Sequence, residues 1–214
     1  MLKKLFSKIS KIIPTINRII INNINRIRLK NRDFTLISNN CLGAFILHDL
    51  NLKFLTPTIT VLIYPEDYIR FLENLKFYLG QEIEFISGQD CNYSIGRLYD
   101  IELQFWHYKD AESAKEKWEK RSKRVNDKNI FIVMTDRDGC TEDNIRRFNN
   151  LPYKNKVIFT NRLYEQFSSA YYIRGFENQS SVGHLNEFQN IFGKRYYDNF
   201  DYVKWFNNGV QSLN

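Results

Sequence analysis

Short apolar segments alternate along this sequence with segments of helical periodicity, and the apolar segments end on polar turn residues. The clearest apolar run is 129–136, and residues 34–37 and 156–160 are similar. Runs that are apolar throughout are typical of strands buried on both faces, and their alternation with helices is the pattern of βαβ units. We therefore expect an α/β fold with a mostly parallel sheet flanked by helices.

Three more segments, 59–64, 82–86 and 100–106, have strand-like character. Residues 164–206 hold thirteen of the 33 aromatic side chains without a strand pattern. We expect an aromatic-rich, helical C-terminal region that packs on the sheet. A chain of 214 residues can form one core, so residues 34–214 are predicted to be a single α/β domain.

Residues 1–33 differ in composition from the rest of the chain. Isoleucines recur there at helical spacing, and residues 1–32 carry nine Lys or Arg and no acid. The remaining chain has 22 basic and 24 acidic residues, which argues against a nucleic-acid-binding core. The pattern predicts a basic amphipathic helix, broken or kinked at Pro14. Residues 1–32 either contact an anionic membrane surface or pack their isoleucines on the body.

The cysteines indicate the compartment. There are three, an odd number, without a CxxC motif, a signal peptide or a transmembrane run. This usage favours a reducing cytoplasm and argues against a disulfide framework or a zinc site. A cytoplasmic location is predicted, at the inner face of the membrane if the N-terminal helix binds lipid. No cofactor is predicted.

Residues 34–50 are expected to form a strand, a polar turn and a helix whose first turn carries Cys41. Asn39 and Asn40 are turn and N-cap residues, and Gly43 allows close approach of a backbone or a ligand. A thiol at such a helix start is expected to have a lowered pKa and to act as a nucleophile. The alternative is a small buried apolar residue.

Cys41, His107 and Asp136 each follow a predicted strand. In a parallel sheet such residues meet at one edge, where they would serve as nucleophile, general base and orienting acid. Asn39 and Asn40 would then bind substrate or donate to an oxyanion, beside Gly43. Alternatively, His107 is a hydrogen-bonded strand-end residue and Asp136 caps the following turn. His48 and His184 are expected to be structural.

Asp136 and Asp138 also form a D-x-D pair after a buried strand. Such a pair holds a divalent metal and a sugar nucleotide in many glycosyltransferases. The alternative is a plain turn, because Asp-Arg-Asp-Gly is rich in turn formers.

Several motifs in order carry a family resemblance. They are ISNNCLG from Ile37, FLTPT from Phe54, WHY from Trp106, WEKRSKRVN from Trp118, VMTDRDG from Val133 and GKRYY from Gly193. Over residues 34–206 the chain resembles a bacterial family of unknown function whose members are usually labelled exopolysaccharide biosynthesis proteins. Ala44 and Thr56 depart from that family's usual glycine and serine.

The chain is more distantly similar to a family of papain-like cysteine peptidases, which implies Cys41 as nucleophile and His107 as base. Residues 1–33 lie outside both resemblances. The first resemblance implies a role in surface-polysaccharide assembly. With the strand-end positions of Cys41 and His107 and the peptidase-like similarity, we expect acyl transfer or hydrolysis, with a saccharide or acylated saccharide as partner. The alternatives are a metal-dependent glycosyltransferase-like protein and a non-catalytic scaffold beside the membrane.

Overall fold

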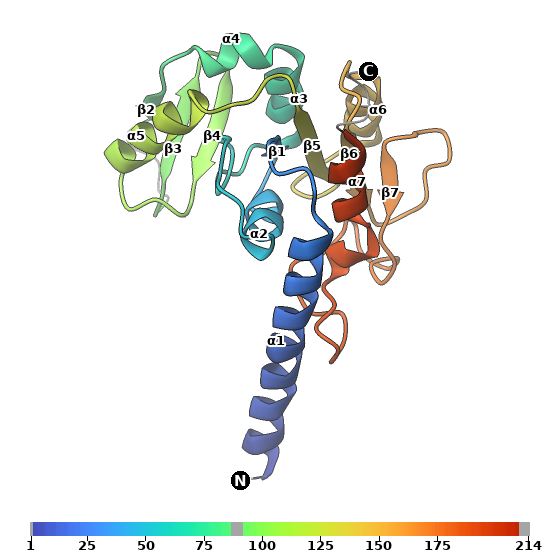
Figure 1. Ribbon diagram of the computed structural model, residues 1–214. Coiled ribbons are helices and arrows are strands. Elements are labelled where there is room, and N and C mark those ends of the chain that lie inside the picture. The colour runs from blue at the N-terminus through green and yellow to red at the C-terminus, as the bar shows by residue number, and fades with distance from the viewer. Residues whose placement is uncertain (1, 87–91, 210–214) are drawn as a thin grey trace.

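A four-stranded parallel sheet forms the centre of the molecule (Figure 1). The computed structural model describes residues 2–86 and 92–209, with side chains from residue 12 onward. The strands lie in the order β1 (Thr35–Ser38), β5 (Ile130–Thr135), β6 (Lys156–Thr160) and β7 (Ala170–Tyr172). All three pairings are parallel, which confirms the predicted α/β class.

Neighbouring residues of the strands point to opposite faces of this sheet, and each face has its own core. Ile37, Ile132 and Met134 pack with α3 (Pro65–Glu73) and α6 (Glu142–Asn150). On the other face, Leu36, Phe131 and Val133 pack with α2 (Leu42–Asp49) and α7 (Tyr202–Asn208). Burial on both faces explains why these strands are apolar throughout.

A second, antiparallel sheet contains β2 (Glu84–Ile86), β3 (Ser94–Leu98) and β4 (Ile101–Phe105). It follows α4 (Leu75–Leu79) and precedes α5 (Ala111–Ser122). Its separation from the parallel sheet was not expected from the strand–helix alternation. Residues 59–64 are not a strand either. They make one isolated bridge, Leu62 to Gln104, and the Ile63 amide donates to the Asn39 carbonyl at 2.8 Å, so this segment links the two sheets.

Side chains cap the starts of α5 and α6, whereas the C-terminal region, predicted to be helical, is only partly so. Asp110 accepts a hydrogen bond from the Ser113 amide, and Thr141 forms a capping box with Asn144. Residues 164–206 include β7, which the sequence pattern does not reveal, and the short 3-10 helix η1 (Tyr196–Asn199) before α7. Most of this region consists of loops that pack aromatic side chains on the sheet.

Helix α1 (Leu2–Arg28) continues through Pro14, and its N-terminal part projects past the rest of the molecule (Figure 1). The expectation that its isoleucines pack on the body is wrong. The side chains that face the body are Arg18, Asn22 and Asn25. The isoleucines at 12, 13, 16, 19, 20, 24 and 27 are exposed. The amphipathic helix is therefore attached to the body by its polar face.

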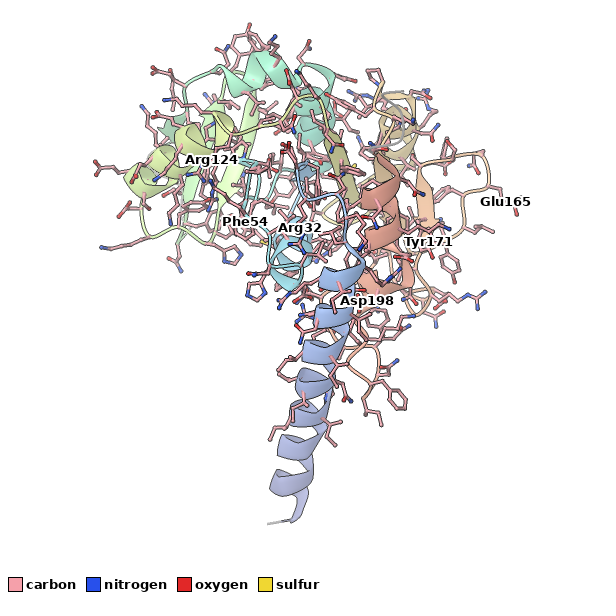
Figure 2. All side chains as sticks on the ribbon, in the orientation of Figure 1. Arg32, Phe54, Arg124, Glu165, Tyr171 and Asp198 are labelled. Atoms are coloured by element: carbon pink, nitrogen blue, oxygen red, sulfur yellow. The ribbon has the colours of Figure 1, made fainter. Side chains whose placement is uncertain are left out.

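A buried ionic network holds α1 in this orientation. Arg18 is 3% exposed and pairs with Asp49 at the end of α2, at 2.6 Å, and with Asp198 of η1. The Tyr197 hydroxyl donates to Asp49, and the side-chain nitrogen of Asn22 donates to the other Asp49 oxygen at 3.0 Å. Figure 2 labels Asp198 where the C-terminal region meets α1.

This network makes stability depend on acid pH through Asp49. Burial alone would raise the pKa of its carboxyl, but the Tyr197 hydroxyl and the Arg18 and Arg195 charges outweigh burial and lower it. A lowered pKa stabilises the fold above the unfolded-state value of about 3.9 and stops doing so as pH falls through the folded-state value. We therefore expect urea unfolding to give a higher free energy of unfolding for the wild type than for Asp49→Asn at neutral pH. This difference should shrink below about pH 4. A gap that stays constant down to strongly acid pH would contradict this linkage.

Candidate functional site

A pocket of about 310 Å³ lies beyond the carboxyl ends of β1 and β5. Five chemically active side chains line it: Cys41, His107, Arg137, Asp138 and His184. They come from the β1–α2 turn, the end of β4, the end of β5 and a C-terminal loop. The expected edge of the parallel sheet is thus where the pocket lies.

The β1–α2 turn fixes the position of Cys41. The Asn40 side-chain oxygen accepts from the Leu42 amide at 3.1 Å, and its nitrogen donates to the Thr135 hydroxyl at 2.8 Å. The turn is thereby tied to the end of β5. Cys41 is half-buried and is itself the N-cap residue of α2, so the prediction that it lies in the first helical turn behind an asparagine N-cap is wrong. Because Asn40 already occupies the Leu42 amide, that amide is not free as an oxyanion donor.

The electrostatics of Cys41 differ from the expectation of a lowered pKa. Burial raises the pKa of the Cys41 thiol above its ordinary value, and the positive charge of Arg137 opposes this rise without cancelling it. The two turns of α2 do not compensate for the loss of water around the sulfur. At neutral pH the resting thiol is protonated, so it needs a base to become a nucleophile.

His107 is an exposed residue two positions after β4 and lines the same pocket as Cys41. Its neighbour Trp106 is 51% exposed and lies edge-on to Tyr93, with ring centroids 5.5 Å apart. Among the described residues, no hydrogen bond joins the Cys41 thiol to the His107 ring. The two groups line the same cavity. An exposed imidazole is free to approach the sulfur when a ligand fills that cavity.

Asp136 is buried and does not line the pocket. Its two carboxylate oxygens accept from the Asn161 and Val182 amides, each at 2.7 Å. Burial raises the pKa of this carboxyl, and the two amide bonds oppose that rise. The structure does not bring Asp136 to His107. Asp136 instead connects the end of β5 to the loop that begins at Val182 and carries His184.

Asn39 and Gly43 lie behind the pocket wall. The Asn39 side-chain oxygen accepts from the Thr135 amide at 3.3 Å, while its buried side-chain nitrogen has no hydrogen-bond partner within the described part of the chain. A Cβ at Gly43 would lie 2.8 Å from the Cβ of Ser38. Gly43 is thus required for close packing of α2 on β1. Neither Asn39 nor Gly43 lines the cavity.

The side chains at the D-x-D pair do not fit a divalent metal. Both oxygens of Asp136 are turned to backbone amides, and Asp138 is paired with Arg137 at 4.0 Å. Metal sites need several converging oxygen or nitrogen ligands. Across residues 2–86 and 92–209, no group of three His, Cys, Asp or Glu is placed to supply them.

Arg137 and His184 are site residues that the sequence reasoning missed. The Arg137 guanidinium lies 3.2 Å from Nδ1 of His184. Because a guanidinium only donates, Nδ1 accepts and the proton of the neutral ring is on Nε2. Arg137 lies inside the D-x-D motif, so its place was predictable. His184 follows no strand, and only the fold of the C-terminal loop brings it to the pocket.

Comparison with known proteins places the pocket and most of α1 inside one matched region. A family model described as Domain of unknown function (DUF1919) matches residues 12–207. An uncharacterized protein of Haemophilus influenzae is 48% identical over 202 residues, covering 94% of this chain and 98% of that relative. The match begins well upstream of residue 34 and so includes most of α1. The chain belongs to the bacterial family defined by the domain of unknown function DUF1919.

Proposed function

We propose that the pocket carries out thiol-dependent acyl transfer or hydrolysis on an acylated saccharide during surface-polysaccharide assembly in the cytoplasm. One observation carries the proposal: Cys41 and His107, which follow strands of different sheets, line the same cavity. Arg137 supports it, because its charge favours the thiolate and would bind an anionic group of the substrate. Exposed Trp106 offers an aromatic face on which a sugar ring can stack.

In the proposed reaction, His107 takes the thiol proton and the Cys41 sulfur attacks the acyl carbon. The carbon–oxygen bond to the sugar then breaks, and the released sugar oxygen takes the proton from His107. Water, or a hydroxyl of a second sugar, attacks the thioester and restores the thiol. His184 accepts from Arg137 through Nδ1, which leaves its Nε2 available as a hydrogen-bond donor.

Alkylation by iodoacetamide tests the thiol–imidazole pair directly. In a Cys91→Ser background we expect Cys41 to react faster than Cys140 near neutral pH, since burial and Asp136 raise the pKa of Cys140 to about 12. His107→Ala should lower the alkylation rate of Cys41 roughly tenfold or more, because the base is lost. His48→Ala, an exposed histidine on α2, is the matched control and should leave the rate unchanged. Peptide mapping by mass spectrometry gives both rates.

Acetate release from O-acetylated saccharides tests the reaction itself. Cys41→Ala and His107→Ala should each reduce turnover roughly a hundredfold or more. Equal labelling of Cys41 and Cys140, or turnover that survives Cys41→Ala, would contradict the proposal and leave the pocket as a binding site in a non-catalytic scaffold.

A further inference from the structure

We propose that the isoleucine face of α1 docks on an anionic lipid surface and positions the pocket-bearing body beside a membrane. The proposal rests on the surface of α1 and is independent of the chemistry in the pocket. Helix α1 exposes its apolar face to solvent, whereas a helix of a globular protein normally buries this face. The seven isoleucines of this face are between 42% and 75% exposed.

The body cannot cover this face, because the opposite side of α1 is fixed to it. Arg18 and Asn25 are buried in contacts with Asp49 and Tyr202. Gly193, at φ +80°, lies against the backbone of α1. A Cβ at this position would lie 2.6 Å from the backbone nitrogen of Arg18. Rotation of α1 to bury its isoleucines would break all of these contacts.

The width of the face favours a bilayer over a partner helix. Its edges are Ile19 and Ile24, five residues apart, which spans about 140° around a helix of 3.6 residues per turn. The seam of a two-stranded coiled coil is narrower than this. The loop beside α1 adds exposed Ile191 and Phe192, and the Asn17 side chain donates to the Ile191 carbonyl at 2.9 Å. Together they form a broad apolar surface rather than a single stripe.

Charge selects the kind of surface. Residues 1–32 contain nine Lys or Arg and no acid; Arg18 and Arg28 are paired with acids of the body, and four of the lysines precede residue 12. A second copy of α1 would bring two helices of the same charge together, whereas anionic headgroups attract them. Within the described residues no helix is long and apolar enough to cross a bilayer. The geometry therefore points to a helix that lies in the headgroup layer.

Vesicle co-sedimentation of the full chain tests this proposal. We expect binding to vesicles of phosphatidylcholine mixed with phosphatidylglycerol, and much weaker binding to phosphatidylcholine alone. The double variant Ile16→Gln/Ile20→Gln should bind roughly tenfold less or weaker still, since two exposed apolar side chains are lost without a change of charge. Circular dichroism should show that this variant keeps the fold.

The matched control replaces equally exposed apolar residues elsewhere, Tyr99→Gln/Leu163→Gln, and should bind as the wild type does. Equal loss in both variants, or equal binding to the two vesicle compositions, would overturn the proposal. A third outcome would also overturn it: no vesicle binding, together with a concentration-dependent dimer in analytical ultracentrifugation that is lost in the Ile16→Gln/Ile20→Gln variant. A second copy of the chain would then cover the isoleucine face.

Discussion

Arg18→Ala is expected to lower the free energy of unfolding by about 3–5 kcal/mol, because it leaves buried carboxylates without their partner. Arg18 binds Asp49 through two nitrogens, at 2.6 and 3.0 Å, and its other terminal nitrogen pairs with Asp198. Removing the guanidinium leaves Asp49 with Tyr197, Asn22 and the half-buried Arg195, whose nitrogen lies 3.6 Å away. Urea unfolding followed by circular dichroism measures the loss.

Arg28→Ala is the matched control on the same helix. Arg28 pairs with Asp201 at 2.6 Å, but both side chains are nearly half exposed. Exposed pairs of this kind contribute about 0–1 kcal/mol. If Arg18→Ala were no more destabilising than Arg28→Ala, the buried network would not be what orients α1. Amide hydrogen exchange in residues 14–28 should rise in Arg18→Ala and stay near wild type in Arg28→Ala.

Asp136→Ala is expected to cost about 2–5 kcal/mol, since it leaves two buried backbone amides unpaired at about 1–3 kcal/mol each. The amides belong to Asn161 and Val182, so the variant also releases the loop that carries His184. Asp136→Asn keeps one acceptor oxygen and should cost less. Thermal and urea unfolding give both values.

Asp138→Asn is the control for this site. Asp138 adopts φ +60°, a conformation that asparagine tolerates, and its nearest charge is Arg137 at 4.0 Å. Its effect should stay within about 0.5 kcal/mol. A different result would change the assignment: if Asp136→Ala kept wild-type stability but abolished the Cys41 alkylation advantage, Asp136 would act on the chemistry.

The parallel sheet was predictable because β1, β5 and β6 are buried on both faces, and burial leaves a continuous apolar run in the sequence. Strand β7 was not predictable, since its three residues are only half-buried and carry no periodic signal. The antiparallel sheet was recognised as strands but not as a separate sheet. Pairing partners depend on tertiary contacts, which strand propensity does not encode.

For the site, the rule that residues following parallel strands meet at one sheet edge holds for Cys41. His107 reaches the pocket from the antiparallel sheet instead, and Asp136 does not line it. The rule locates a residue at the sheet edge, whereas the direction of its side chain depends on which amides lie nearby. For Asp136 these amides come from residues 25 and 46 positions further along the chain. The orientation of α1 was likewise hidden, because its periodicity shows an amphipathic helix without showing which face meets the body.

The contacts that orient α1 also set an order of events during protein synthesis. Arg18 and Asp198 are 180 residues apart, and Arg28 and Asp201 are 173 apart. The helix therefore leaves the ribosome well before Asp198 and Asp201, whereas Asp49 follows Arg18 by only 31 residues. Until Asp198 and Asp201 are made, the basic, isoleucine-rich segment lacks these two partners, so it can meet a lipid surface or a chaperone before the body has folded. A nascent chain interrupted before Asp198 would display α1 with Asp49 but without the C-terminal acids of its anchor.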